Sequence, residues 1–245
     1  MTATTYVIAA TPRSGSSLLA EGLEATGIVG RPAEYFAPDF TWLWKDHWGL
    51  TQDCTWGQYL GRAMAYATTA NGVRGVKMHW EQVPWLAGAL GVHGPASSVI
   101  EALFPGAVFV NIVRGDRRAQ AISLFRAMSS NEWCRFPGSP RSDAELAALT
   151  PTPAQIRRLE EGVSAQQANW ERYLHERGAR VHTVRYEELD ADYRGEIGRV
   201  LEFLGAEPER AQALPEPRLE RQSDELNERW QRLIDDSERA EVLTT

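Results

Sequence analysis

A short serine-rich segment near the start of the chain carries residue types that bind small anions. The segment Arg13-Ser14-Gly15-Ser16-Ser17 lies between an apolar run at residues 6–10 and a stretch of helical leucine spacing that ends near Gly27. Where a strand passes through such a loop into a helix, backbone N–H groups and the positive end of the helix dipole converge on one point, and Ser and Arg side chains add donors. The sequence therefore predicts a phosphate or sulfate site at this loop.

Two common nucleotide-binding motifs do not match this loop. The P-loop of nucleoside triphosphatases, G-x-x-x-x-G-K-[ST], supplies a lysine for the outer phosphates and a hydroxyl for magnesium. Here Arg13 supplies the charge, and no lysine follows Gly15. The dinucleotide motif G-x-G-x-x-G is also absent from the loop. Taken alone, the loop also fits an ordinary strand-to-helix turn capped by serine, which is the alternative interpretation.

Lysine is rare in this chain, which makes each lysine informative. Only two of the 26 basic residues are lysines, Lys45 and Lys77. Lysine offers a compact point charge, whereas arginine offers a planar fork. Lys77 and His79 are two residues apart at the end of an apolar run, so strand alternation places their side chains on one face. We therefore expect both side chains to reach the same site.

Four short apolar runs predict the strands that position these residues. They cover residues 6–10, 73–79, 107–113 and 180–185. Helical stretches separate them, which predicts an α/β fold with a parallel sheet and crossover helices. The loop after the first run, Lys77 and Arg114 all fall at the carboxyl ends of predicted strands, where such sheets bind ligands.

The spacing of apolar residues predicts three further helices. Two cover residues 115–130 and 153–177, and the third carries Ile197 and Val200 on one face and ends at Gly205. Residues 131–140 are predicted to form a loop. The length suits a single domain over residues 1–245.

An aromatic-rich insertion is predicted at about residues 38–70. Its aromatic residues are Phe40, Trp42, Trp44, Trp48, Trp56, Tyr59 and Tyr66. They could form a lid or a sugar-stacking wall beside the site, or a small satellite core under a long connection. The satellite core is the simpler interpretation of each tryptophan.

Composition excludes several classes of protein. A formal net charge of −7 and a pI near 5.4 argue against a nucleic-acid partner, which would call for a basic face. Cys54 and Cys134 make neither a disulfide framework nor a zinc motif. No apolar run approaches the roughly 18 residues of a membrane span, so no integral membrane contact is expected. The first residues lack a basic region followed by an apolar one, which favours a cytoplasmic protein.

Several segments, taken in order, resemble sulfotransferases that use 3′-phosphoadenosine 5′-phosphosulfate (PAPS). The loop TPRSGSS resembles their 5′-phosphosulfate loop, and the segment from Arg114 to Ser123 resembles their 3′-phosphate-binding element. The pair RYEEL (185–189) and FLG (203–205) is typical of the superfamily. The segments GRPAEYF (30–36), GVK (75–77) and LERQ (219–222) are most similar to bacterial trehalose-type sulfotransferases.

The resemblance implies a fold and a set of donor-binding residues. It implies a P-loop-like three-layer fold, in which helices flank a central, mainly parallel sheet. The 5′-phosphosulfate would be held by Arg13 and by the segment from Ser14 through Gly15 and Ser16 to Ser17. The 3′-phosphate would be held by Arg114, Ser123 and Arg221.

The resemblance also implies the catalytic residues. Lys77 would lie by the oxygen that bridges phosphorus and sulfur, and Arg13 would neutralise the transferred group. Two residues could act as the general base. Glu34 matches the proposed base of the bacterial family, whereas His79 matches the K-x-H arrangement of animal cytosolic sulfotransferases, and both alternatives stay open here.

The predicted function is therefore that of a PAPS-dependent sulfotransferase of the EC 2.8.2 type. It would move a sulfuryl group by in-line displacement to a hydroxyl of a small molecule, expected to be a carbohydrate or a glycosylated metabolite, and leave adenosine 3′,5′-bisphosphate (PAP). No metal is needed for this chemistry. The alternatives are a P-loop kinase and a nucleotide-binding protein without catalysis. The resemblance also suggests a homodimer.

Overall fold

The computed structural model of the protein describes residues 5–135, 137–138, 143–219 and 225–243. The chain divides into two compact units. Unit 1 comprises residues 1–113 and 166–215, and unit 2 comprises residues 114–165 and 216–245. The expectation of a single domain over residues 1–245 stays a prediction.

Unit 1 is built on a four-stranded parallel sheet with the order β2-β1-β3-β4. The strands are β1 (Thr5–Ala10), β2 (Arg74–His79), β3 (Val108–Val113) and β4 (Val181–Arg185). Each predicted strand is confirmed, with the observed start within one residue and the same last residue. The runs were readable because strands buried on both faces are almost continuously apolar.

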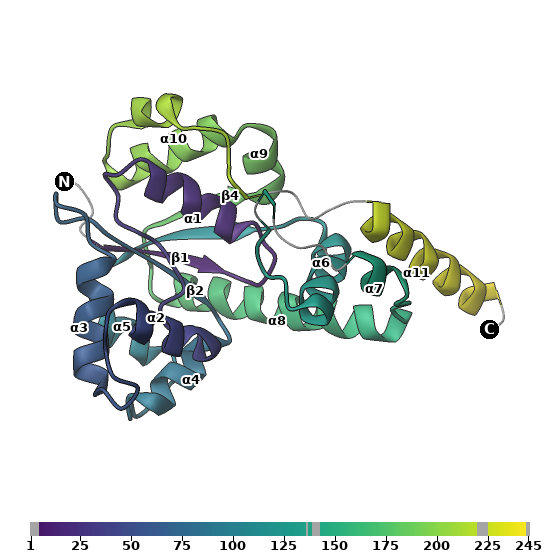
Figure 1. Ribbon diagram of the computed structural model, residues 1–245, viewed down its shortest axis with the longest axis horizontal. Helices are drawn as coiled ribbons and strands as arrows, with labels where there is room; N and C mark the ends of the chain where they lie inside the picture. The colour runs from purple at the N-terminus through teal and green to yellow at the C-terminus, as the bar shows by residue number, and fades with distance from the viewer. Residues whose placement is uncertain (1–4, 136, 139–142, 220–224, 244–245) are drawn as a thin grey trace. The chain divides into compact units, whose positions relative to one another are not determined.

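Helices cover both faces of this sheet, which confirms the predicted three-layer α/β fold (Figure 1). One face is covered by α1, α9 and α10, and the other by α3, α4, α5 and the end of α8. The helical segments of unit 1 are α1 (Ser16–Ala25), η1 (Pro38–Phe40), α2 (Thr41–His47), α3 (Trp56–Tyr66), α4 (Gln82–Ala89), α5 (Ser98–Leu103), α8 from residue 166 onward (Pro153–Glu176 in full), α9 (Tyr186–Ala191), α10 (Tyr193–Leu204) and η2 (Pro208–Ala213).

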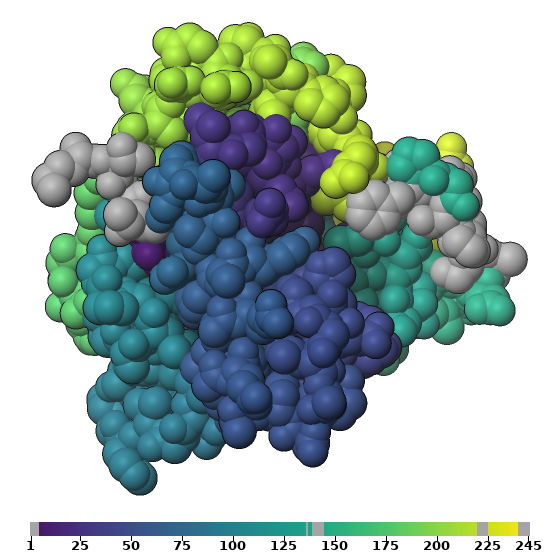
Figure 2. All heavy atoms as spheres, turned by 60° about the vertical axis from the view of Figure 1, so that its left-hand side comes forward, coloured from purple at the N-terminus to yellow at the C-terminus, as the bar shows by residue number. Residues whose placement is uncertain are grey.

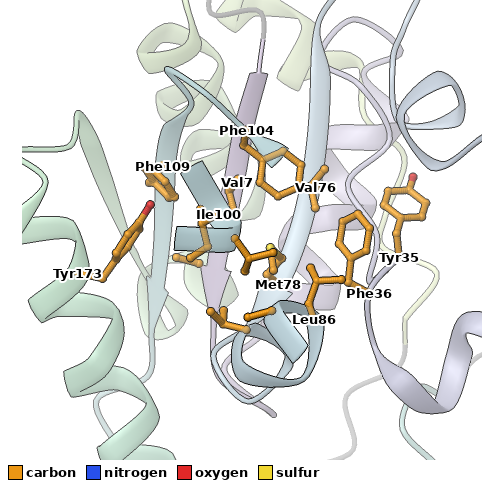
Figure 3. Packing of buried hydrophobic residues seen from close by; sticks show 14 of the residues in the cluster. Val7, Tyr35, Phe36, Val76, Met78, Leu86, Ile100, Phe104, Phe109 and Tyr173 are labelled. Atoms are coloured by element: carbon orange, nitrogen blue, oxygen red, sulfur yellow. The ribbon is translucent and has the colours of Figure 1, made fainter. Parts of the chain in front are cut away.

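Alternate residues of β1 supply two separate cores. Tyr6 and Ile8 pack with α1 and α10, whereas Val7 packs with residues of β2, α4 and α5 on the opposite face (Figure 3). The strand register pairs Ile8 with Lys77 and Ala10 with His79. Because paired residues of neighbouring strands share a face, Lys77 and His79 lie on the α1 face of the sheet. This agrees with the predicted common face.

The aromatic insertion forms a satellite core on unit 1. The rings of Trp44, Trp48, Tyr59 and Tyr66 pack among themselves and around Tyr35. The segment appears in blue in Figure 2 as a continuous outer layer. Trp42 lies outside this core, and its surface is 56% exposed. The packing supports the satellite-core interpretation for the other members of this cluster.

Unit 2 is helical in the part that the structure describes. Its elements are α6 (Arg117–Ser130), α7 (Asp143–Ala147), α8 up to residue 165 and α11 (Glu225–Leu243). The predicted start of α6 at residue 115 is two residues early, because the Asp116 side chain caps the helix by accepting from Ala119 N at 2.8 Å. Trp230 and Ile234 of α11 pack against Ile122 of α6.

A group of charged residues also joins the helices of unit 2. Arg118 of α6 lies 2.7 Å from Glu160 of α8 and 2.7 Å from Glu238 of α11. Asp235 contacts Arg118 at 3.1 Å, and Arg157 contacts Glu238 at 3.0 Å. We refer to these five residues as the Arg118 network. They tie three helices together at partly exposed positions.

Within the described ranges, no helix is long and apolar enough to cross a membrane. Over the same residues, no group of three His, Cys, Asp or Glu side chains is arranged to hold a metal ion. Cys54 is a free thiol.

Candidate active site

The anion loop between β1 and α1 has a backbone that depends on glycine. Gly15 caps α1 with a φ of 90°, and Arg13 also has a positive φ, of 62°. A Cβ atom at Gly15 would lie 2.4 Å from Cδ2 of Tyr186, the residue that opens α9 directly after β4. Glycine is therefore required here both for its conformation and for the close approach of the tyrosine ring. The RYEEL segment packs against the loop through this tyrosine.

The loop carries hydrogen-bonding groups suited to an anion. Ser14 is fully buried, and among the residues that the structure describes its Oγ has no hydrogen-bond partner. The first turn of α1 begins directly after Gly15, and the first N–H groups of any helix lack intrahelical acceptors. Trp170 of α8 fixes the strand that leads into the loop, since its Nε1 donates to the Ala10 carbonyl at 2.9 Å. These features fit a bound phosphate or sulfate group.

Lys77 joins the anion loop to a carboxylate. Its Nζ lies 2.8 Å from Glu34 Oε1 and donates to Ser17 Oγ at 3.0 Å. The lysine side chain is 7% exposed and that of Glu34 is 18% exposed. The buried ammonium group of Lys77 thus lies between the start of α1, which follows the anion loop, and the segment that carries Glu34.

Two further side chains complete this group. Gln82, at the start of α4, donates from Nε2 to Glu34 Oε2 at 2.9 Å, and His79 Nδ1 lies 3.5 Å from the same oxygen. We refer to Ser17, Glu34, Lys77, His79 and Gln82 as the Glu34 cluster. Its members come from α1, the segment after α1, β2 and α4.

The electrostatics of the cluster favour an ionised Glu34. Burial alone would raise the pKa of this carboxyl, but the electrostatic interactions with His79 and Lys77 and the hydrogen bonds from Lys77 and Gln82 outweigh it and lower the pKa to about 2. Glu34 is therefore a carboxylate throughout the neutral range.

His79, in contrast to Glu34, is uncharged at neutral pH. Burial lowers its pKa, and Lys77 and Arg13 act in the same direction, against the carboxylates of Glu34 and Glu81. The imidazole is therefore neutral near pH 7. Among the described residues its Nε2 has no hydrogen-bond partner, and that atom is buried. Glu34 is the more accessible of the two predicted bases.

The main chain around Glu34 is held from several sides. Trp44 Nε1 donates to the Glu34 carbonyl at 3.1 Å, and the Tyr59 hydroxyl donates to the Tyr35 carbonyl at 2.5 Å. Lys77 N donates to the Ala33 carbonyl at 3.1 Å. The satellite core thus fixes the segment that carries the carboxylate, by contacts to backbone atoms.

Comparison with known proteins identifies the family. A family model described as Stf0 sulphotransferase matches residues 5–235. The chain belongs to the Stf0 sulphotransferase family. It is 28% identical to a trehalose 2-sulfotransferase of Mycolicibacterium smegmatis over 93% of this chain and 92% of that protein. It is 27% identical to a trehalose 2-sulfotransferase of Mycobacterium tuberculosis over 92% of each chain. The predicted sulfotransferase resemblance is confirmed.

Two solved structures are also similar. A sulfotransferase from Alicyclobacillus acidocaldarius aligns with a TM-score of 0.47 at 16% identity, over 94% of this chain and 91% of that one. The sulfotransferase domain of the Synechococcus PCC 7002 olefin synthase aligns with a TM-score of 0.43 at 17% identity, over 93% of this chain and 86% of that one.

The other predicted donor residues of this sulfotransferase lie in unit 2. Arg114 follows β3 directly, and Ser123 is a buried residue of α6, 6% exposed. Arg221 lies outside the described residues. Their assignment to a 3′-phosphate stays a prediction.

Sequence reasoning missed Gln82 and the role of Tyr186. Gln82 follows His79 by three residues at a strand-to-helix junction, so its position at the carboxyl edge of the sheet was visible in the sequence. Nothing in the local pattern indicated that its amide would reach Glu34, 48 residues earlier.

Proposed function

We propose that this sulfotransferase transfers a sulfuryl group from PAPS to a hydroxyl group of a carbohydrate. The observation that carries the proposal is Lys77, whose ammonium contacts both Ser17 of the anion loop and the carboxylate of Glu34. One group thereby links an anion-binding element to a base. The names of the two trehalose 2-sulfotransferases support a sugar acceptor.

The donor would be bound at its two anionic ends. Arg13 and the backbone N–H groups of residues 14–17 hold the 5′-phosphosulfate, for which Ser14 Oγ offers a buried hydroxyl. Arg114 and Ser123, with Arg221, hold the 3′-phosphate and thereby distinguish PAPS from nucleotides that lack it.

The reaction exchanges one sulfur–oxygen bond for another. The acceptor oxygen forms a bond to sulfur while the bond from sulfur to the phosphate oxygen breaks, and PAP leaves. Lys77 stabilises the negative charge that grows on this leaving oxygen. As Lys77 turns to that oxygen, Glu34 loses part of the positive charge that lowers its pKa and becomes a stronger base.

Glu34 accepts the proton of the acceptor hydroxyl in this scheme. Its carboxylate is ionised and partly exposed, whereas His79 Nε2 is buried. His79 is the alternative base. A general base contributes roughly 10²–10⁴-fold to the rate, so the Glu34→Gln variant is expected to lose at least about 100-fold in transfer while the His79→Gln variant retains most of it. The reverse ranking would assign the base to His79.

The donor and the reaction class can be tested directly. With ³⁵S-labelled PAPS, label should appear in trehalose or in another member of a panel of sugars and glycosides, and absence of label from all of them would contradict a carbohydrate acceptor. PAP should raise the melting temperature in the presence of EDTA. Stabilisation by ATP with magnesium, but not by PAP, would instead favour the P-loop kinase.

A further inference from the structure

Gln82 occupies a position between the predicted base and the backbone of β2. It is 2% exposed, and its side chain makes a hydrogen bond at each end of its amide. Nε2 donates to Glu34 Oε2 at 2.9 Å, and Oε1 accepts from His79 N at 3.3 Å. A backbone N–H only donates and a carboxylate only accepts, so these two partners allow a single orientation of the amide.

The two oxygens of Glu34 therefore have different partners. Oε1 contacts Lys77, whereas Oε2 receives the amide of Gln82 and faces His79. The contact to Lys77 is released in the proposed reaction, when the ammonium turns to the leaving oxygen. The contact to Gln82 involves no charge that the donor attracts, so it remains and holds the plane of the carboxylate.

We propose that Gln82 is the positioning residue of the base: it orients the Glu34 carboxylate toward the acceptor hydroxyl and is anchored by the backbone of His79. This inference rests on the proposed function, in which Glu34 takes the proton. It assigns to the start of α4 a part in the reaction, in addition to covering the sheet. A neutral amide serves this purpose because it stabilises the carboxylate without neutralising it.

The decisive substitution is Gln82→Glu. Glutamate has the same shape and can still accept from His79 N, so only the group that faces Glu34 changes, from a donor to a second carboxylate. Two adjacent carboxylates share a proton, which raises the pKa of one of them. Charged or titratable groups near this pair are Lys77, His79, Glu81 and Arg13. None of them is altered by the substitution.

The test is the pH profile of sulfuryl transfer under single-turnover conditions with saturating ³⁵S-PAPS. In Gln82→Glu, the pH of half-maximal transfer should rise by at least about one unit relative to the wild type. A profile with an unchanged midpoint would overturn the inference, because it would mean that the side chain at position 82 does not act on the group that takes the proton.

A second variant covers the case in which Gln82→Glu does not fold. Gln82→Met keeps the length of the side chain and removes both hydrogen bonds. Its kcat should fall about tenfold or more while its KM for PAPS stays within about twofold. Equal kcat in Gln82→Met and wild type would overturn the inference.

Two further variants serve as controls for the Gln82 substitutions. Gln155→Met also removes a side-chain acceptor of a backbone N–H, that of Thr152 at 2.8 Å, but at the start of α8 in unit 2; it should keep the wild-type kcat and pH profile. Glu34→Gln separates the two proposals. If Glu34→Gln transfers at the wild-type rate, the base assignment fails and the role of Gln82 fails with it; if it is inactive while both Gln82 variants behave as wild type, only the role of Gln82 is wrong.

Discussion

The Glu34 cluster and the Arg118 network are both groups of opposite charges, yet they differ in how completely those charges are satisfied. In the Arg118 network each contact joins an arginine to a carboxylate, and the Arg118 side chain is 25% exposed. The hydrogen bonds that Arg118 donates to Glu160 and Glu238 raise the pKa of its guanidinium, which keeps it charged at every accessible pH. The pairing with arginine also lowers the pKa of Glu238, so both partners stay charged near neutral pH and the network ties the helices together.

The Glu34 cluster combines unlike groups in a more buried place. Its lysine is 7% exposed, its imidazole is neutral, and the buried His79 Nε2 has no partner among the described residues. Perturbed pKa values of this kind gather at functional sites. Burial, and the presence of neutral and charged titratable groups side by side, therefore indicate a functional ion cluster better than the number of its ion pairs does.

The largest difference in activity between variants of the two regions is expected from Lys77→Met in the Glu34 cluster. Removing the ammonium takes away the charge that stabilises the leaving oxygen, so kcat should fall roughly 10²–10³-fold. Rapid-quench measurement of ³⁵S transfer gives this value. Lys45→Met, which alters a partly exposed lysine whose Nζ donates to the Gln52 carbonyl, is the matched control and should retain the wild-type rate. A loss of less than tenfold in Lys77→Met would mean that Lys77, like Arg118, has a structural role and no part in catalysis.

The next contrast concerns stability in acid. The pKa of Glu34 is about 2 in the folded protein, against an ordinary value of 4.5. A lowered pKa contributes stability that is complete above about pH 4.5 and is lost as the pH falls toward 2, on the order of 3 kcal/mol in total. Urea unfolding should therefore show Glu34→Gln less stable than wild type at pH 6, with the gap closing between pH 4.5 and pH 2. A gap that does not depend on pH would mean that the ionised form of Glu34 is not favoured by folding.

Gly15→Ala should weaken donor binding about tenfold or more. The added methyl would meet Tyr186 at 2.4 Å in a backbone with φ of 90°, so the loop must shift. Gly27→Ala is a matched control, because it has a φ of 71° but nothing within 4 Å of the added atom. Calorimetric titration with PAP should separate the two variants. Equal affinities would show that the packing of Tyr186 on the loop has no influence on the donor site.

Arg118→Met should have the smallest effect and should act on stability alone. Partly exposed ion pairs contribute little, so the free energy of unfolding should fall by about 1 kcal/mol, and less in 1 M salt. The rate of sulfuryl transfer should remain within about twofold of wild type. A larger loss of activity than of stability would give the Arg118 network a part in the reaction and end the contrast drawn above.

Much of the fold of unit 1 could be predicted because its signals are local. The run from Tyr6 to Ala10 is apolar without interruption, and Pro12 follows two residues after its end. Gly205 ends α10 in the left-handed conformation expected of a C-terminal glycine. The common face of Lys77 and His79 followed from strand alternation alone. Such features depend on neighbours a few residues apart.

The contacts that complete the site could not be predicted in the same way. Gln82 reaches Glu34, and Tyr186 covers Gly15, across long separations in sequence. Whether two such side chains meet depends on the packing angle of whole helices and on side-chain rotamers. The sequence could name Glu34 and Lys77 through resemblance, but the distance of 2.8 Å between them required the assembled fold.

The hydrogen bonds from Trp44 and Tyr59 to the backbone around Glu34 have a consequence for how the chemistry of this enzyme could be changed. Both rings hold carbonyl oxygens, which every amino acid possesses, and neither touches the carboxylate through those bonds. These two hydrogen bonds therefore do not depend on the side chain at position 34. Replacing Glu34 by a shorter acid, a histidine or a cysteine should leave the local backbone conformation unchanged, which makes position 34 the natural starting point for redesigning proton transfer in this enzyme.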